Sequence, residues 1–269
     1  ISMHYDLGND FFSMWLDKTL TYSCGIFNSP KETLEQAQIN KYNKLINMVK
    51  PSRGDRILEI GCGWGGFAEH LAKNYDIKLD CITISKKQFL FTKERIRRAG
   101  LNRKVNVQML DYRDVENKYD IIVSIEMIEA VGEKYLNKYF KVIKENLSPG
   151  GRAAIQAIVI KDELYNRYRM KEDFIQKYIF PGGMLPCQRS IKDNCNEVGM
   201  NIISDKGFGK DYASTLAIWR TSFHNAWPKI KSLGFDTRFK RLWSFYLASC
   251  EGSFRGEGID VRQIIMENN

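Results

Sequence analysis

Between residues 56 and 160, short apolar runs alternate with longer amphipathic segments, and this alternation constrains the fold more than any other feature of the chain. Strands buried on both faces of a sheet read as near-continuous apolar runs, whereas the helices that cover them carry one apolar stripe. The alternation therefore predicts an α/β fold with a parallel sheet covered on both faces. The predicted strands are Arg56–Ile60, Leu79–Ile84, Val105–Leu110, Asp120–Ile125 and Arg152–Ile160, and the predicted helices are Phe67–Lys73, Lys87–Ala99 and Tyr135–Asn146.

The rest of the chain flanks this core, which we assign to residues 51–160. Residues 1–50 are expected to form a helical cap, with a helix over 31–50 that stops at Pro51. Residues 161–201 lose the regular alternation and are rich in polar and aromatic side chains, which indicates a lid over the carboxyl edge of the sheet. Residues 202–269 are expected to complete the sheet with strands near Ile202–Ile203 and Asp260–Met266, joined by basic, aromatic helices. Because the chain begins at Ile1, a further N-terminal domain is expected to precede it.

A glycine-rich turn, Glu59–Gly66, follows the first predicted strand and opens the next helix. Glycines let a ligand approach the backbone closely, and the first turn of a helix offers free N–H groups. Three of the glycines have the dinucleotide-binding spacing GxGxxG. A nicotinamide enzyme, however, needs an acid at the end of the second strand to hold the ribose, and here that strand ends in Thr83–Ser85, without an acid. Glu59 before the glycines and the turn Ser148–Gly151 are more typical of S-adenosylmethionine (SAM) methyltransferases, so we favour that class over a dehydrogenase.

An excess of basic residues limits the partners that the surface can attract. The chain has 41 Lys and Arg against 32 Asp and Glu, a net charge of +9, and the stretch from Lys206 to Arg241 holds eight basic residues against two acids. This stretch is either an ordinary solvated face or a peripheral contact with an anionic membrane, with aromatic side chains at the interface. Nucleic acid is a weaker interpretation because no RNA-binding module is present. The aromatic residues concerned are Trp219, Trp227, Phe235, Phe239 and Trp243.

The cysteines and the hydropathy indicate the compartment. The six cysteines form no CxxC pair, so no metal site is predicted. Cys81 lies within an apolar run, where a buried reduced thiol is common, and this favours a reducing compartment. No run approaches the roughly 18 apolar residues that a membrane-spanning helix needs, and no signal peptide opens the chain. We therefore expect a cytoplasmic location.

Eight short motifs follow one another from residue 4 to the last predicted strand. They are His4–Phe12, Leu20–Phe27, Glu59–Gly66, Thr83–Gln88, Glu126–Gly132, Phe174–Gly183, Asp211–Leu216 and Cys250–Arg255. In this order they resemble the cyclopropane fatty acid synthases and mycolic acid cyclopropane synthases, over essentially the whole chain. The resemblance implies a class I SAM-methyltransferase fold, a Rossmann-like doubly wound sheet with helical lid insertions. Larger members of the family carry an extra N-terminal domain.

The resemblance implies a site for SAM, whose product is S-adenosylhomocysteine (SAH). The cap would close over the cofactor, and the glycine turn would meet its methionine part. Hydroxyl and amide groups after the second strand would replace the missing ribose-binding acid, and residues after the third strand would flank the adenine. In that order the residues are Tyr22 and Ser23; Gly61, Cys62 and Gly63; Thr83, Ile84, Ser85 and Gln88; and Asp111 and Tyr112, where many relatives carry Trp at the last position.

The reaction implied by the resemblance adds the methyl group of SAM to a cis double bond of a phospholipid acyl chain. The carbocation then loses a proton and closes to a cyclopropane. The family is understood to hold a bicarbonate ion as the base, and its holders correspond to Cys24, Glu129, Gln156, Ile158 and Tyr212. The best-known relatives carry His where Gln156 stands, but Gln keeps an N–H donor, so the anion site is expected to survive.

Several of these residues also have purely structural interpretations. Cys24 could be a packed thiol, Glu129 an acid that stabilises a helix start, and Tyr212 a core aromatic. The aromatic residues of the 161–201 segment could likewise serve packing alone, although we favour a lid over the acyl chain. These residues are Tyr165, Tyr168, Phe174, Tyr178 and Phe180.

Other functions stay open at this point. The same cation could lose a different proton and give a methylene- or methyl-branched chain. Coclaurine-type N-methyltransferases, which act on small amines, share the early blocks, and a non-catalytic SAM- or lipid-binding protein is a third alternative. The expected partners are unsaturated phospholipid acyl chains and the anionic inner membrane surface, contacted peripherally; a homodimer is left open, and nucleic acid is not expected.

Overall fold

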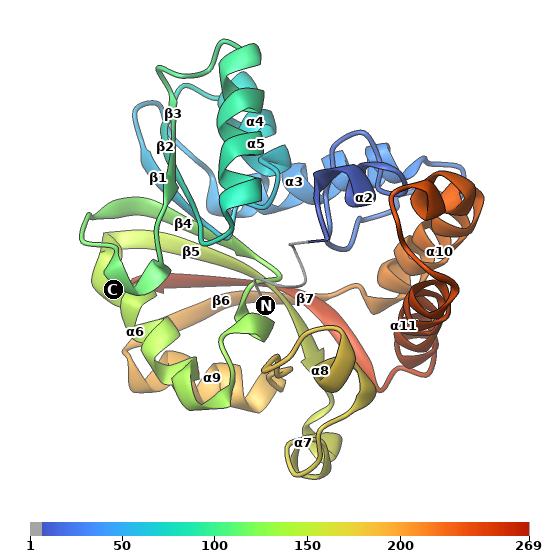
Figure 1. Cartoon of the computed structure of the whole chain (residues 1–269). Helices are drawn as coiled ribbons and strands as arrows, with labels where there is room; N and C mark the ends of the chain where they lie inside the picture. The colour runs from blue at the N-terminus through green and yellow to red at the C-terminus, as the bar shows by residue number, and fades with distance from the viewer. Residues whose placement is uncertain (1–6, 269) are drawn as a thin grey trace.

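The computed structural model describes residues 7–268, so the first three residues of the His4–Phe12 motif lie outside the described part. Its centre is a seven-stranded sheet in the order β3-β2-β1-β4-β5-β7-β6 (Figure 1). The order reverses between β1 and β4, and in open α/β sheets ligands bind at the carboxyl ends of strands at such a point. The strands are β1 Arg56–Ile60, β2 Lys78–Thr83, β3 Val105–Met109, β4 Tyr119–Ile125, β5 Leu147–Ile160, β6 Met200–Gly207 and β7 Ile259–Asn268.

The sheet is mixed, and this corrects the expectation of a parallel sheet at one edge. Strands β1 to β5 pair in parallel, but β7 runs antiparallel to both β5 and β6. The reason is the connection between β6 and β7, which consists of α10 Gly209–Ser232 and α11 Thr237–Arg255. Both helices lie at the carboxyl end of β5, so the chain must re-enter the sheet from that end and run backwards.

Helices cover both faces of the sheet, as the alternation predicts. On one face α4 Gly66–Asn74 and α5 Lys86–Arg98 pack against β2 and β3, and α3 Leu34–Val49 packs against α4, β5 and β7. On the other face α6 Leu136–Asn146 and α9 Gln188–Glu197 pack against β4, β5 and β6. The apolar stripe of each helix meets the near-continuous apolar strands, which gives one core on each side of the sheet.

A third core lies beyond the carboxyl edge and consists mainly of aromatic side chains. It joins α2 Asn9–Ser13 to α10 and α11. Trp219 and Trp243 are fully buried in it, and Phe239 stacks on Trp243 with ring centroids 5.4 Å apart. The aromatic residues of the basic stretch therefore pack mainly inward. Trp219 and Trp243 are thus too deeply buried to reach a membrane interface, and the membrane contact itself stays a prediction.

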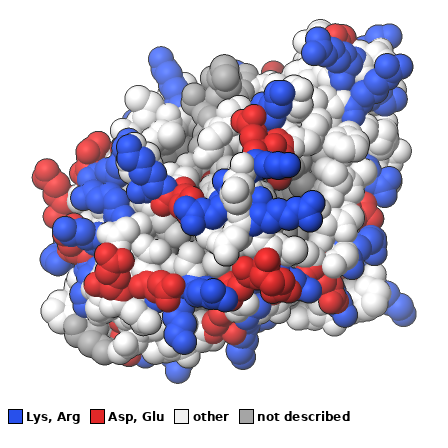
Figure 2. All heavy atoms as spheres, turned by 90° about the horizontal axis from the view of Figure 1, so that it is seen from below, with Lys and Arg blue, Asp and Glu red and all other residues white. Residues whose placement is uncertain are grey.

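The segment between β5 and α9 forms two short helices, α7 Asp162–Tyr168 and α8 Phe174–Tyr178. Neither contains a fully buried residue, so they lie over the body rather than within it. Figure 2 views the molecule from the side on which α7 lies in Figure 1, and Lys and Arg side chains alternate there with Asp and Glu. Within residues 7–268 no helix combines the length and the apolar character needed to cross a membrane.

Candidate active site

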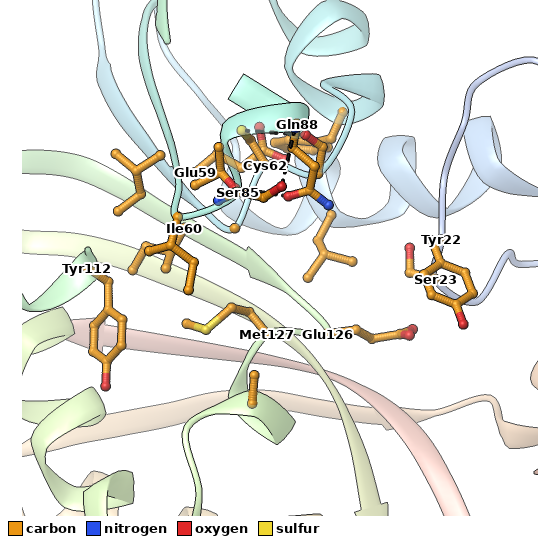
Figure 3. Close-up of a pocket in the computed structure, with 18 of the residues that line it drawn as sticks. Tyr22, Ser23, Glu59, Ile60, Cys62, Ser85, Gln88, Tyr112, Glu126 and Met127 are labelled. Carbon is orange, nitrogen blue, oxygen red and sulfur yellow. Dashed lines mark hydrogen bonds between the residues drawn. The ribbon is translucent and has the colours of Figure 1, made fainter. Parts of the chain in front are cut away.

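The glycine turn forms the wall of a cavity of about 380 Å³ at the carboxyl ends of β1, β2 and β4 (Figure 3). Gly61, Gly63 and Gly65 all have positive φ angles, a backbone conformation that glycine adopts without strain. A Cβ at Gly61 would lie 3.0 Å from the Met127 side chain, so this glycine also permits a close approach of two chain segments. The turn lies at the reversal point of strand order, where the fold places its ligands.

The structure brings all eleven residues predicted to contact the cofactor to this one cavity. They come from the cap, from the ends of β1 and β2, and from the segment after β3. Sequence positions as far apart as 22 and 112 thus line a common space. The residues are Tyr22, Ser23, Gly61, Cys62, Gly63, Thr83, Ile84, Ser85, Gln88, Asp111 and Tyr112.

Hydrogen bonds preorganise the part of the cavity beside β2. Thr83 Oγ1 donates to Gln88 Oε1 at 2.9 Å, and the Ser85 backbone N–H donates to Thr83 Oγ1 at 3.2 Å. Ser85 Oγ accepts from the Gln88 backbone N–H and so caps α5. These three buried side chains stand where a nicotinamide enzyme would carry an acid, and they offer hydroxyl and amide groups to a ribose.

The segment after β3 lines the opposite end of the cavity. Asp111 forms a hydrogen-bonded ion pair with Arg113, with 2.7 Å between Oδ2 and the guanidinium, and this contact lowers the pKa of Asp111. The Tyr112 ring meets Tyr139 edge to face, with centroids 5.6 Å apart. The ring of Tyr112 therefore has a fixed position on the cavity wall.

A buried lysine anchors the cap to the cavity. Lys41 on α3 is fully buried, and its Nζ donates to Ser23 Oγ at 2.6 Å. Burial lowers the pKa of Lys41 to about 8. Gln38 Nε2 also donates to the Ser23 carbonyl at 2.8 Å. Sequence reasoning missed Lys41 because a lysine on an amphipathic helix is usually a solvated residue.

A second cavity, of about 480 Å³, opens between β5, the lid and α10–α11. Its walls are mostly apolar, including Ile158, Leu185 and Leu216, together with Phe180 and Tyr246. The two cavities share Tyr22, Glu126 and Ala130, so they meet at these residues. A shared wall allows a group bound in one cavity to face a chain bound in the other. Of the predicted lid aromatics, Tyr168 and Phe180 line the second cavity.

Three of the five residues predicted to hold an anion surround the carboxylate of Glu126. The Cys24 backbone N–H donates to Oε1 at 2.9 Å, and Gln156 Nε2 donates to the same oxygen at 2.8 Å. The Tyr212 hydroxyl donates to Oε2 at 2.5 Å. Gln156 is itself oriented by Gln263, whose Nε2 donates to Gln156 Oε1 at 3.0 Å.

The other two predicted residues form a neighbouring pair. The Ile158 backbone N–H donates to Glu129 Oε1 at 2.5 Å, whereas the buried Oε2 has no hydrogen-bond partner within the described residues. Burial and the nearby Glu126 raise the pKa of Glu129 to about 8. Glu129 is therefore mainly protonated at neutral pH, and it is one of the residues that line the second cavity.

These contacts decide among the structural interpretations of the same residues. The Cys24 thiol donates to the Gly25 carbonyl, so Cys24 contributes its backbone rather than its sulfur. Tyr212 stacks on Phe254, with centroids 4.4 Å apart, yet its hydroxyl faces Glu126. Glu129 lies in a three-residue 3₁₀ turn, which is too short to make helix-start stabilisation its main role.

The same contacts do not fit a bicarbonate ion as the sequence predicts it. The donors of Cys24, Gln156 and Tyr212 already point at a carboxylate of the chain itself. A free anion held by these donors would meet the negative charge of Glu126 at hydrogen-bonding distance. The donors as arranged in this structure therefore do not fit the bicarbonate ion, which stays a prediction, and no step below depends on that ion.

Glu126 is the functional residue that sequence reasoning missed. It lies in the Glu126–Gly132 motif, directly after β4, and only the second glutamate of that motif was selected. Its place at the end of a strand beside the reversal of strand order is the signal that could have found it. Figure 3 shows the Glu126 side chain pointing toward Tyr22.

The residues of the first cavity fit SAM by their chemistry. The glycine backbone lets a ligand approach closely, and the hydroxyl and amide groups can form hydrogen bonds with a ribose. The Tyr112 ring can pack against an adenine. When bound, SAM supplies an electrophilic methyl group carried on a sulfonium. The sheet, the glycine turn and this cavity define the class of SAM-dependent methyltransferases.

Comparison with known proteins places the chain within that class. The sequence matches the mycolic acid cyclopropane synthetase family over residues 1–264, and the chain belongs to this family. It is 38% identical over 271 residues to the tuberculostearic acid methyltransferase UfaA1 of Mycobacterium tuberculosis, covering 98% of this chain and 63% of the relative. It is 39% identical over 262 residues to the cyclopropane-fatty-acyl-phospholipid synthase of Escherichia coli K12, covering 97% of this chain and 66% of that relative. The chain thus spans just under two thirds of the length of each.

Solved structures agree with the family assignment. The mycolic acid cyclopropane synthase CmaA1, complexed with SAH and CTAB, superposes with a TM-score of 0.94 at 27% identity, covering 99% of this chain and 96% of that one. The cyclopropane synthase MmaA2 from Mycobacterium tuberculosis gives 0.93 at 26% identity, again covering 99% and 96%. The predicted Rossmann-like fold with lid insertions is confirmed.

Proposed function

We propose that this chain transfers a methyl group from SAM to the cis double bond of an unsaturated phospholipid acyl chain and forms a cyclopropane ring. One observation carries the proposal: a polar cavity suited to SAM meets an apolar cavity at Tyr22, Glu126 and Ala130. An acyl chain in the second cavity would present its double bond at that junction. The cyclopropane synthases among the relatives support this reaction type.

The aromatic side chains at the junction suit a cationic reaction. Tyr22 and Tyr246 join their hydroxyls at 2.7 Å, and Phe180 meets Tyr246 edge to face with centroids 6.1 Å apart. The faces of such rings attract positive charge, and this attraction is strongest in a dry site of low dielectric constant. We therefore assign these rings to stabilising the positive charge that develops on the acyl chain.

A branched product is the second candidate, favoured by the similarity to the tuberculostearic acid methyltransferase. The same cation would give a methylene-branched chain if a hydride shift moved the positive charge to the carbon that bears the new methyl group. Loss of a proton from that methyl would then form the double bond to the new carbon. The junction residues serve both outcomes, so the product must be identified chemically.

The lid offers a contact for the lipid that carries the acyl chain. Four exposed apolar side chains lie on α7, on α8, between these helices and on α11: Leu164, Tyr178, Met170 and Phe245. Leu164 also lines the second cavity, so the exposed apolar surface is continuous with its lining. We propose that this surface meets a bilayer peripherally, and that exposed cations of α10–α11 such as Lys229, Lys231 and Arg238 attract anionic lipid. Vesicle binding that weakens with added salt would support the electrostatic part.

The test is to incubate the protein with methyl-labelled SAM and vesicles of an unsaturated phospholipid, and to analyse the fatty acids by gas chromatography and mass spectrometry. A saturated-ring product one CH₂ heavier than the parent supports the proposal. A labelled methylene- or methyl-branched chain supports the second candidate. Label found only on small amines, or no transfer at all, would contradict both.

A further inference from the structure

The carboxylate of Glu126 is held by three of the residues that the family resemblance assigns to a free anion. Three donors from three separate elements converge on it: the cap backbone at Cys24, the β5 side chain of Gln156 and the α10 hydroxyl of Tyr212. Donors from distant parts of a fold converge on one carboxylate when the fold is built to hold a negative charge there. In this chain the negative charge is covalently attached.

The backbone conformation of Glu126 is one that residues other than glycine disfavour, so the fold holds this residue in place at a cost. Its φ angle is +50°, in the left-handed region that glycine adopts freely and other residues adopt at a cost. Strained conformations of this kind persist where the surroundings hold them, and they gather at functional sites. A glycine would suit the backbone better, so the glutamate is there for its side chain.

The location of Glu126 brings its carboxylate to the reacting atoms. It is one of three residues that line both cavities, and it is the only carboxylate among those three. A methyl group that passes from the first cavity to a chain in the second therefore arrives beside it. Ala130 has no ionisable group, and the Tyr22 hydroxyl is hydrogen-bonded to the Tyr246 hydroxyl at 2.7 Å.

We propose that Glu126 is the built-in catalytic base of this enzyme and takes the place of an exchangeable bicarbonate ion. This inference rests on the proposed function and identifies the base of that reaction. Once the double bond has accepted the methyl group, a C–H bond of that methyl breaks and its electron pair forms the closing C–C bond of the ring. The proton passes to Glu126, which becomes a neutral carboxylic acid and later returns the proton to solvent.

The charged and titratable groups around Glu126 suit this exchange. Lys41 on α3 attracts the ionised form, and the Tyr212 hydroxyl and Gln156 amide stabilise it by hydrogen bonds. Burial opposes ionisation more strongly than any other cause and raises the pKa of Glu126, which makes it a stronger base. Glu129 is the second carboxylate nearby, and the Cys24 thiol is buried at the same place. Because the pKa of Glu129 is about 8, Glu129 is mainly neutral at pH 7 and adds little repulsion to a charge on Glu126.

The first test compares methyl transfer by the unaltered protein in bicarbonate-depleted buffer and after bicarbonate is added back. We expect the two rates to agree within about twofold, because the base is part of the chain. Stimulation of about tenfold or more by bicarbonate would overturn the inference while leaving the proposed function intact. Absence of transfer to lipid in both buffers would instead contradict the proposed function.

The second test exchanges the built-in base for a free one. Glu126→Gly removes the carboxylate and relieves the positive φ; we expect turnover to fall about 100-fold or more and to recover about tenfold with added bicarbonate. Glu126→Gln keeps the bulk of the side chain, so it should lose turnover without rescue. Glu257→Gly, at an exposed glutamate that also has a positive φ of +55°, controls for the backbone change. Unchanged turnover of Glu126→Gly in depleted buffer would overturn the inference.

Calorimetry decides the inference without relying on turnover. We expect titrated bicarbonate to bind Glu126→Gly and to give no heat of binding with the unaltered protein, whose donors are occupied. Equal bicarbonate binding by both proteins would show that the anion does not compete with Glu126, and would overturn the inference. Melting curves of both variants confirm that each is folded when it is titrated.

Discussion

The two cavities differ in how the chain builds them. The first is formed by turns at the ends of neighbouring parallel strands, and its groups are held by short-range hydrogen bonds such as those among Thr83, Ser85 and Gln88. The second is enclosed by lid helices without fully buried residues and by helices α10 and α11, which are distant from β5 in sequence. The first is thus a rigid edge of the sheet, and the second is a space between elements that can be repacked.

Of the variants that affect one cavity and not the other, Gly61→Val is expected to have the largest effect, on SAM binding. The φ of +80° and the 3.0 Å approach to Met127 leave no room for a branched side chain, so the SAM dissociation constant should rise about 100-fold or more. Gly54→Val is the matched control, because Gly54 has a similar φ of +88° and no atom within 4 Å of an added Cβ. Calorimetric titration with SAM measures both; equal loss of SAM affinity in both variants would contradict the assignment of the first cavity.

Filling the second cavity should affect the lipid substrate alone. Ser249 lines this cavity on α11, whereas the adjacent Ala248 is exposed and does not. We expect Ser249→Phe to lower turnover on phospholipid vesicles about tenfold, with SAM affinity within about twofold of the unaltered protein. Ala248→Phe should be nearly neutral in both assays. If Ser249→Phe weakens SAM binding and leaves lipid turnover intact, the two cavities have been assigned the wrong ligands.

A smaller effect is expected at the hydroxyl bridge where the cavities meet. Tyr246→Phe keeps the ring but removes the 2.7 Å contact with Tyr22, which links the cap to α11. A hydrogen bond of this kind contributes about 1 kcal/mol, so turnover should fall about threefold to tenfold while the ring still faces the acyl chain. Tyr246→Leu removes the ring as well and should lose more. Equal rates for Phe and Leu would argue against a role for the ring in stabilising positive charge.

The smallest effect concerns stability and its dependence on pH. The pKa of Glu129 in the folded chain is about 8, above its ordinary value of 4.5, so the unfolded chain ionises first as pH rises. The contribution of Glu129 to stability is therefore largest below about pH 4.5 and is lost progressively up to about pH 8. Glu129→Gln removes this dependence, so its melting temperature relative to the unaltered protein should rise between pH 5 and pH 8.5, by roughly 5 °C. A difference independent of pH would mean that Glu129 is ionised at neutral pH.

The comparison also explains which features the sequence could predict. The strands of the core and the contacts of the first cavity follow from local patterns, since a turn such as Glu59–Gly66 carries its own backbone requirements. The first predicted strand, Arg56–Ile60, matches β1 in the structure at both ends. The antiparallel edge was not predictable in this way, because the direction of β7 is decided by where α10 and α11 pack.

Glu126 was missed for the same physical reason. Its three donors lie 102, 30 and 86 positions away along the chain, so no local pattern reports their convergence. The motif that contains it drew attention to Glu129, whose carboxylate accepts a hydrogen bond from the Ile158 backbone N–H. The family resemblance supplied the donors correctly but assigned them a free anion. Only the fold reveals that the carboxylate belongs to the chain.

The most direct test of the account is a crystal structure with SAH and an unsaturated acyl-chain ligand, grown with bicarbonate in the buffer. The account predicts that the SAH sulfur and the double bond approach each other at Tyr22, Glu126 and Ala130, with the Glu126 carboxylate still held by Cys24, Gln156 and Tyr212. It would be contradicted by an acyl chain bound outside the second cavity. Density for a separate trigonal anion among those three donors, with Glu126 turned away, would contradict the built-in base.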